Sequence, residues 1–439
     1  MKRLALRLSG FSGIVPAAIL LLALPIPASA IPNTFIGGGF IGPLVPSQPV
    51  FNANLTADFL SVDNWRAGEF PGPWRRPNAA GEIELRSMAR MPVLFGAVPD
   101  SVVARSESDT GELREIIITY LDAGTYFPYL GGGEQSRDQR EKGEARRAEF
   151  DARWRELDRT LRRRLEAGCG GSGEMTVAGV SAPLRVAYTD FTWEHFRLRL
   201  ARRQNHSIAL HLSPAAMPAP GWIDEDIAAL DRRTRAERLA GQVQANDRGE
   251  QLVTGVPVFD QGFTPYCGVH ALAMVAHYHG LRMLPGELAA GAEFQNTGSA
   301  KGSRITDLYR AVGDELGLDF SHSARFDARR AERAVREGLP VIVWRRVTLE
   351  REKAHAELAE QFAAEPNLRA VPPLEPGVLA SLPHRKQMGS PSHASVVIGV
   401  DQEAGTVLYL EPWGDHARER RMRIEELEAT AYASFYYAP

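Results

Sequence analysis

The alternation of hydrophobic and polar residues predicts a β-rich region over residues 57–215. The segment FRLRLARR alternates strictly, as a strand with one buried face does. LREIIITYLDAGTY is a longer apolar run that ends at a glycine turn. Further strands are predicted at GEIELRS, VVARSES, MTVAGV, LRVAYTDF and HSIALHLSP.

One long charged helix, at about residues 135–167, interrupts these strands. Its apolar residues recur at three- and four-residue spacing and form a single stripe, made by Phe150, Trp154, Leu157 and Leu161. Glutamate and aspartate alternate with the arginines of this helix. We therefore interpret its basic residues as a solvated face, and expect no nucleic-acid partner.

From residue 251 to the C-terminus, the pattern changes to helices followed by strands. Residues 216–250 hold a linker, AMPAPGW, and a second charged helix, IDEDIAALDRRTRAERLAGQVQAN. Helices are then predicted at CGVHALAMVAHYHG, SRITDLYRAVGDELG and DARRAERAVREG, and strands at LPVIVWRRV, HASVVIGVD and GTVLYL, with a closing helix. Residues 349–390 are a polar, proline-containing insertion of undefined conformation. This order is typical of an α+β layout.

The first thirty residues have the three-part layout of a secretory signal peptide. Three basic residues precede an apolar stretch that ends in Ala-Ser-Ala, which predicts cleavage after Ala30. The stretch is short and interrupted by prolines, which disfavours a membrane anchor, and no cysteine follows it to carry a lipid. We expect a periplasmic or secreted protein without a membrane anchor after cleavage. Residues 31–56, rich in glycine and proline, are predicted to be irregular.

Composition is that of an ordinary globular protein. Hydrophobic residues make up 44% and charged residues 24% of a 439-residue chain, which is long enough for two or three domains. Removing residues 1–30 takes away three basic residues and no acidic one, so the net charge of −3 becomes −6. Neither value indicates a nucleic-acid surface.

The chain has two cysteines, Cys169 and Cys267. Export to an oxidising compartment favours paired cysteines, so one disulfide, with a redox-gated enzyme as its functional form, is one interpretation. Cys267, however, opens an apolar helix directly after the loop QGFTPY. A helix N-terminus stabilises a thiolate, so Cys267 is a candidate nucleophile. Considered alone, it also fits a buried and inert thiol.

The residues that would complete a thiol site lie far along the chain. His393 begins the strand HASVVIGVD, and the returning strand leads to Glu411, 18 residues after the histidine. A hairpin of this length places the two side by side, where a carboxylate can hold the imidazole by its second nitrogen. Gln261 lies six residues before Cys267 and, with the Cys267 N–H, is placed to face an oxyanion.

In combination, DQGFTPYCGVHALAMVAHYHG, LPVIVWRRV and SHASVVIGVD…GTVLYLEPWGD resemble the papain-like cysteine peptidases. The resemblance is closest to the bacteriocin-processing, or double-glycine, branch and covers residues 252–439. It implies a papain-like catalytic domain over residues 251–439, with an N-terminal helical part and an antiparallel sheet. The whole chain is then α+β, this domain being preceded by a β-rich N-terminal domain with a long charged helix.

Residue by residue, the resemblance implies that Gln261 serves the oxyanion, Cys267 is the nucleophile and His393 is the general base. Glu411 stands where that family has aspartate, or asparagine in papain relatives, and its extra methylene makes it the least secure member. Asp415 and Asp401 are the alternate acids. The aromatic ring of Trp413 either covers the histidine, as in papain relatives, or belongs to the core.

The implied function is hydrolysis of amide bonds in a peptide or protein substrate, without a metal or an organic cofactor. Two alternatives remain: a non-catalytic binding protein with a papain-like shell, and acyl transfer to an amine by the same triad. His270, His277 and His279 suggest a metal, but no carboxylate or cysteine is placed to complete a site. The sequence leaves open whether residues 31–250 are a pro-region or a binding module, and it does not define the oligomeric state.

Overall fold

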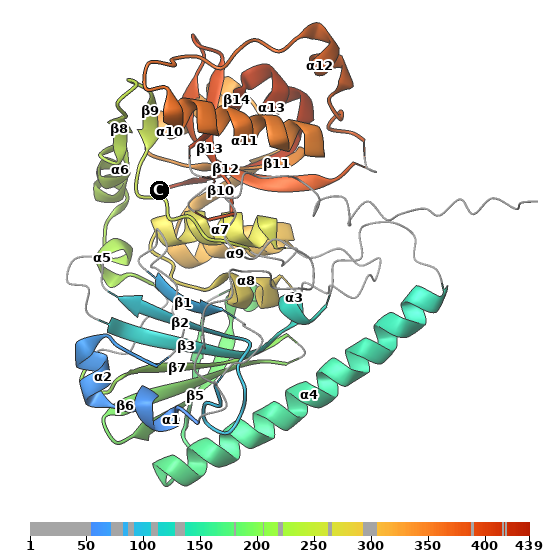
Figure 1. Ribbon diagram of the computed structural model, residues 1–439. Coiled ribbons are helices and arrows are strands. Elements are labelled where there is room, and N and C mark those ends of the chain that lie inside the picture. The colour runs from blue at the N-terminus through green and yellow to red at the C-terminus, as the bar shows by residue number, and fades with distance from the viewer. Residues whose placement is uncertain are drawn as a thin grey trace, which may run out of the picture. The chain divides into compact units, whose positions relative to one another are not determined.

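The computed structural model describes most of the chain from residue 54 onward. The described residues are 54–71, 82–86, 92–106, 113–127, 137–179, 181–204, 206–217, 223–261, 266–292, 305–387, 390–414, 417 and 419–439. The predicted signal peptide and the irregular segment that follows it lie outside them, apart from the last three residues of that segment. Two large antiparallel sheets organise the described residues (Figure 1). The predicted mixture of helices and antiparallel sheet is confirmed.

Seven strands in the described part of the chain form the first sheet, in the order β1-β2-β3-β7-β6-β5-β4. They are β1 (Glu82–Arg86), β2 (Ser101–Ser106), β3 (Leu113–Asp122), β4 (Glu174–Ala178), β5 (Val186–Trp193), β6 (Phe196–Arg203) and β7 (Ser207–Pro214). β3 is buried on both faces: Ile116 and Ile118 join one hydrophobic cluster, and Ile117 joins another. Its near-continuous apolar run follows from this double burial.

Helix α4 (Arg137–Cys169) covers one face of this sheet. Its apolar stripe packs on the sheet: Phe150, Leu161 and Leu165 are fully buried, and the Trp154 indole donates to the carbonyl oxygens of β6 and β7. Arg147 and Asp151, and Arg162 and Asp158, form pairs one turn apart along the helix, and the buried Asp158 also lies 3.5 Å from Arg202 of β6. Among the described residues, no helix has the combined length and apolar character that crossing a membrane requires.

The second sheet contains six strands of the described residues, in the order β10-β15-β11-β12-β13-β14. They are β10 (Asp319–Ser323), β11 (Val341–Arg346), β12 (Ser392–Asp401), β13 (Thr406–Leu410), β14 (Arg420–Arg423) and β15 (Ala431–Ala438). The helices around it include α7 (Cys267–Tyr278), α9 (Ile305–Leu316), α10 (Ala328–Arg336), α11 (Leu349–Ala364) and α13 (Ile424–Thr430). Neighbouring residues of β11 face opposite ways: Trp344 meets Gly268 of α7, and Arg345 pairs with Glu352 of α11. α7 and α11 therefore pack on opposite faces (Figure 1).

Two predicted helices are wrong in part. The second charged helix is divided into α5 (Glu225–Ala228), α6 (Arg232–Ala240) and the short strand β8 (Val243–Ala245), which pairs with β9 (Gln251–Val253). The division follows from Asp231, whose side chain accepts the Thr234 N–H at 2.8 Å and starts a new helix. The chain also closes on a strand and not on a helix, because the aromatic run of β15 pairs with both β10 and β11.

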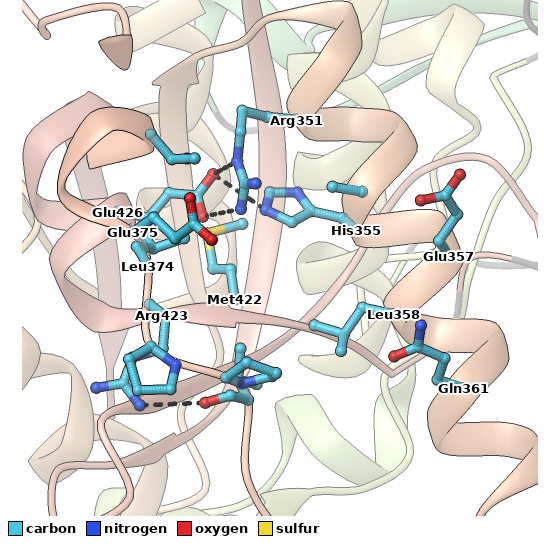
Figure 2. A pocket seen from close by; sticks show the side chains of 15 residues that line it. Arg351, His355, Glu357, Leu358, Gln361, Leu374, Glu375, Met422, Arg423 and Glu426 are labelled. Carbon is cyan, nitrogen blue, oxygen red and sulfur yellow. Dashed lines mark hydrogen bonds and ion pairs between the residues drawn. The ribbon is translucent and has the colours of Figure 1, made fainter. Parts of the chain in front are cut away.

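The insertion at residues 349–390 contains α11 and α12 (Pro376–Ser381). Thr348 caps α11, its hydroxyl accepting the Arg351 N–H at 3.3 Å. Between α11, the loop before α12 and β14 lies an open hollow of about 300 Å³ (Figure 2). The arginines that line it are paired with glutamates, as Arg351 is with Glu426, so the hollow has no strong charge of either sign.

A buried cluster of charges joins the first sheet to α8 (Pro285–Gly291). His211 of β7 lies between two carboxylates, with Nδ1 2.8 Å from Oε1 of Glu115 and Nε2 3.5 Å from Oε1 of Glu287. Arg105 adds a positive charge 3.5 Å from Glu115. Burial lowers the pKa of His211, but the charge of Glu115 and the hydrogen bonds to both carboxylates outweigh it and raise this pKa to about 9. The imidazolium thus ties the sheet to the helix.

This cluster predicts a pH dependence of stability. Because the pKa of His211 is raised, its stabilising contribution is complete below the ordinary histidine value and is lost as pH rises through about 9. The shift corresponds to a loss on the order of 3 kcal/mol in the free energy of unfolding between about pH 6.5 and 9. Urea unfolding across this range, compared with His211→Gln, measures it. Parallel curves for the two proteins would contradict the prediction.

Candidate active site

Cys267 is the first residue of α7 and lies at its positive end. The sulfur accepts hydrogen bonds from the backbone N–H groups of Gly268 and Ala394, the latter in strand β12. The helix N-terminus and the second sheet thus meet at this atom. Both features favour the thiolate over the thiol, because each directs a positive dipole at the sulfur.

His393 contacts both Cys267 and Glu411. Its Nε2 lies 2.6 Å from Oε2 of Glu411, and its side chain is also hydrogen-bonded to the Cys267 thiol. Because the carboxylate engages Nε2, Nδ1 is the ring nitrogen that faces the sulfur. The structure therefore brings together the three residues that the sequence proposed as a triad.

Glu411 is held on both of its oxygens. Besides the contact of Oε2 with His393, Oε1 accepts hydrogen bonds from the Arg345 guanidinium at 2.7 Å and from the Ser395 hydroxyl at 3.0 Å. The side chain has no solvent exposure. Its extra methylene, which made it the least secure prediction, does not prevent a short contact with the imidazole.

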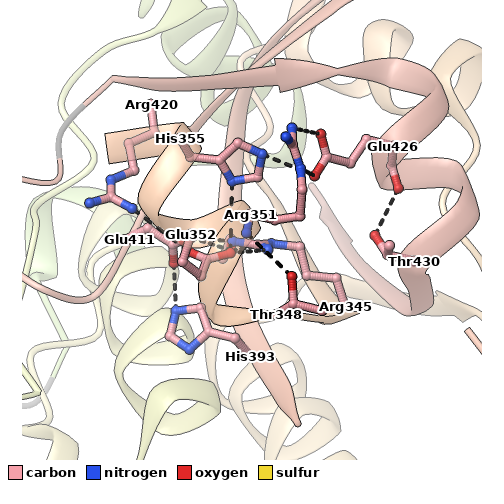
Figure 3. A network of polar contacts seen from close by, with 11 residues as sticks. Arg345, Thr348, Arg351, Glu352, His355, His393, Glu411, Arg420, Glu426 and Thr430 are labelled. Atoms are coloured by element: carbon pink, nitrogen blue, oxygen red, sulfur yellow. Dashed lines mark hydrogen bonds and ion pairs between the residues drawn. The ribbon is translucent and has the colours of Figure 1, made fainter. Parts of the chain in front are cut away.

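The contacts of Glu411 continue into a buried polar network (Figure 3). Arg345 also donates to Glu352 of α11 at 2.6 Å, and Arg420 lies 3.7 Å from the same carboxylate. His355, one turn further along α11, lies between Glu352 and Glu426. Charges of opposite sign alternate through the network, which compensates for their removal from water.

These contacts favour an ion pair between the thiol and the imidazole. Burial raises the pKa of the Cys267 thiol, but the hydrogen bond and charge of His393 outweigh it and hold this pKa below its ordinary value. Burial likewise opposes the positive charge of His393, yet Glu411 and Cys267 raise its pKa to about 10. Burial raises the pKa of Glu411, but the charges of His393 and Arg345 outweigh burial and hold this pKa below its ordinary value, so the carboxylate stays ionised.

The position of Cys267 depends on close packing at Gly268. A Cβ atom at this residue would lie 2.0 Å from the Trp344 ring, so only glycine lets β11 approach the helix this closely. The Gly268 carbonyl accepts the Tyr309 hydroxyl at 2.6 Å, and the Trp344 indole donates to the same hydroxyl at 3.2 Å. This contact fixes the start of α7 against the sheet.

Gln261 lies on a segment that is paired with the chain following Glu411. Its backbone N–H donates to the Pro412 carbonyl at 2.8 Å, and its neighbour Asp260 forms a β-bridge with Trp413. The Trp413 ring lies 4.6 Å from the His393 ring, at an interplanar angle of 31°. The indole therefore covers one face of the imidazole. The four residues between Gln261 and Tyr266 are not described.

Asp401, one of the two alternate acids, does not join this site. Asp401 is the last residue of β12, roughly 26 Å along the strand from His393 at the usual rise per residue. Its carboxylate accepts the Ala404 N–H at 2.9 Å and so belongs to the hairpin turn. Asp415 lies outside the described residues.

The remaining candidates have local roles. Cys169 and Cys267 are both free thiols and pack against different hydrophobic clusters, and burial raises the pKa of Cys169. His270 pairs with the Tyr266 carbonyl at 3.0 Å, and His277 with the Met283 carbonyl at 2.9 Å. Burial lowers the pKa of His279 to about 3. Within the described part of the chain, no three metal-binding side chains converge.

Sequence reasoning missed Arg345, Ser395 and Glu352. One signal was present: the segment LPVIVWRRV is an apolar strand in which a charged residue occurs at an inward-facing position. A charge in a buried strand requires a partner of opposite sign. The identity of that partner depends on strand register and on the helix in the insertion, which the sequence pattern did not define.

A family model described as the Peptidase_C39 like family matches residues 253–438. One similar solved structure, described as a C39-like peptidase from Bacillus anthracis, is 19% identical with a TM-score of 0.28, covering 43% of this chain and 96% of that one. Another, the peptidase domain of Streptococcus ComA, a bi-functional ABC transporter involved in a quorum-sensing pathway, is 15% identical with a TM-score of 0.24, covering 42% and 99%. No curated protein matches. Residues 253–438 thus match a C39-like peptidase family, and the predicted resemblance to papain-like peptidases is confirmed over that segment.

The packing at Gly268 gives a stability prediction. Gly268→Ala forces the Trp344 ring and the start of α7 apart, and we expect it to lower the free energy of unfolding by about 1–3 kcal/mol. Gly286→Ala is the matched control, since a Cβ atom there meets nothing within 4 Å and the change is expected to stabilise by about 0.4–1 kcal/mol. Urea denaturation of the wild type and the two variants measures these free energies of unfolding. Equal stability of the two variants would contradict the prediction.

Proposed function

We propose that residues 253–438 hydrolyse amide bonds in peptides or proteins by thiol catalysis. The observation that supports this most strongly is the position of His393, which contacts the Cys267 thiol and the Glu411 carboxylate at once. A cysteine at a helix N-terminus, beside an imidazole that a buried carboxylate orients, is the arrangement that activates a thiol nucleophile. The match to a peptidase family supplies the substrate class.

In the proposed reaction, the Cys267 thiolate attacks the carbonyl carbon of the scissile bond. The backbone N–H of Cys267 and the Gln261 side chain stabilise the oxyanion of the tetrahedral intermediate. His393 gives its proton to the leaving amine, which breaks the C–N bond and leaves a thioester. Water, deprotonated by His393, then hydrolyses the thioester and restores the ion pair. Glu411 keeps the imidazole oriented and stabilises its positive charge throughout.

We further propose that the protein acts after export and that the seven-stranded sheet serves as a pro-region or a binding module. The sequence before Ala30 supports export, and the contact of His211 with α8 gives the sheet a fixed attachment to the peptidase segment. The thioester also allows acyl transfer to an amine in place of water. Acyl transfer is distinguished from hydrolysis because it gives an amide of the added amine and not a free carboxylic acid.

Selective alkylation of Cys267 is the first test. We expect iodoacetamide to label Cys267 of the purified protein at least about tenfold faster than Cys169 at pH 6, because a thiolate reacts and an ordinary thiol is largely protonated there. Mass spectrometry locates the label. Cys267→Ala is the control for site assignment, and His393→Gln is expected to slow the labelling. Labelling of Cys267 no faster than of Cys169 would remove the basis of the proposal.

Turnover is the second test. Incubation with a peptide library, with and without an added primary amine, is expected to give cleaved peptides whose formation is lost in Cys267→Ala. Amide products with the added amine would favour acyl transfer. Rapid labelling without products of either kind would favour the non-catalytic papain-like protein.

A further inference from the structure

We propose that Arg345 is the positioning residue of this site: its guanidinium, fixed by Glu352, sets the place where the Glu411 carboxylate meets His393. The inference rests on the proposed function, because it concerns the same thiol. It also explains how a glutamate serves at a position where the resembled family has a shorter acid. Arg345 contacts the Glu411 carboxylate, so it acts on the imidazole and the thiol through Glu411.

The strand register places Arg345 next to His393. Arg345 of β11 and His393 of β12 are direct cross-strand partners, so their side chains leave the sheet on one face. Val396 pairs with Leu410, and by continuation the preceding Ser395 opposes Glu411. Like charges opposite one another destabilise a sheet, and here the Glu411 carboxylate lies between them. It gives one oxygen to each, at 2.7 Å from Arg345 and 2.6 Å from His393.

Arg345 is itself held in one orientation. One terminal nitrogen donates to Glu352 at 2.6 Å, the other to Glu411, and Nε lies 3.3 Å from the Ser395 hydroxyl. The guanidinium also stacks over Tyr409 at 5.5 Å. A planar guanidinium with donors on both sides fixes the two carboxylates relative to each other, whereas a lysine ammonium is a point charge without this geometry.

The longer side chain of Glu411 requires a group that holds it in one orientation. Glutamate has one more rotatable bond than aspartate, and each such bond has about three staggered positions. An unclamped Glu411 would therefore populate orientations that leave His393 without its partner. The guanidinium selects the one orientation in which Oε2 meets Nε2 of the imidazole.

The pH profile of Cys267 alkylation tests this role in the full chain. We expect Arg345→Lys to move the midpoint of the profile upward by about one pH unit, which is about tenfold slower labelling below the midpoint, although the positive charge is kept. Glu352→Gln separates positioning from charge. Removal of a negative charge by itself favours the thiolate and lowers the midpoint, whereas a loosened guanidinium raises it. We expect a rise.

Arg421→Lys is the matched control. Arg421, in the edge strand β14 of the same sheet, makes a similar two-nitrogen contact with Glu250, at 2.9 and 2.6 Å. It should keep the wild-type midpoint. Urea unfolding of each variant shows whether it folds, and if Arg345→Lys does not fold, Glu352→Gln decides.

The outcomes separate the two proposals. The positioning role is overturned if Cys267 of the wild type reacts fast but the midpoint is unchanged or lowered in both variants. If Arg345→Lys does not fold, an unchanged or lowered midpoint in Glu352→Gln alone overturns it. In either case the proposed function stays intact. A wild-type Cys267 that reacts no faster than Cys169 overturns both.

Discussion

The Glu411 carboxylate is buried without any solvent exposure at the end of β13, and the surrounding residues keep it charged. An isolated carboxylate in such a place is far less stable than in water, and it persists only when positive groups and hydrogen bonds replace the lost hydration. Glu411 has a cationic partner on each oxygen, Arg345 and His393, and a hydroxyl from Ser395. Any change in the register of these strands would leave one of these charges unpaired.

This requirement links parts of the chain that are distant in sequence. The carboxylate stabilises the imidazolium of His393, and the imidazolium stabilises the thiolate of Cys267 at the start of α7. On the other side, the second terminal nitrogen of Arg345 donates to Glu352 of α11. The insertion at residues 349–390 therefore supplies part of the support of the site, in addition to any contribution to the surface around it.

A similar arrangement occurs at the junction of the seven-stranded sheet with α8. His211 there lies between two carboxylates, as a buried positive charge that joins two elements. No thiol is in contact with it, and carboxylates face both of its ring nitrogens. A buried histidine with a raised pKa is thus not by itself a sign of catalysis. What distinguishes His393 is its hydrogen bond to a thiol at a helix N-terminus.

The sequence by itself determined the elements that have a strong local period and the residues that have a distinctive chemical context. Strict alternation marked β6, the apolar stripe marked α4, and the apolar run after Cys267 marked α7. The spacing of His393 and Glu411 followed from the geometry of a hairpin, which is local. Where local signals competed, sequence reasoning was wrong: Asp231 started a new helix within a charged segment, and the aromatic C-terminus became a strand between β10 and β11.

Only the tertiary structure decided whether the Glu411 carboxylate reaches the imidazole of His393. The same carboxylate contacts Arg345, which the register of β11 and β12 places opposite His393. Arg345 in turn contacts Glu352, which α11 brings from an insertion without a clear pattern. The tertiary structure likewise decided that Asp401 belongs to a turn and that Gly268 is needed for the approach of Trp344. Such contacts depend on pairing and packing between distant segments, and periodicity along the chain carries no information about them.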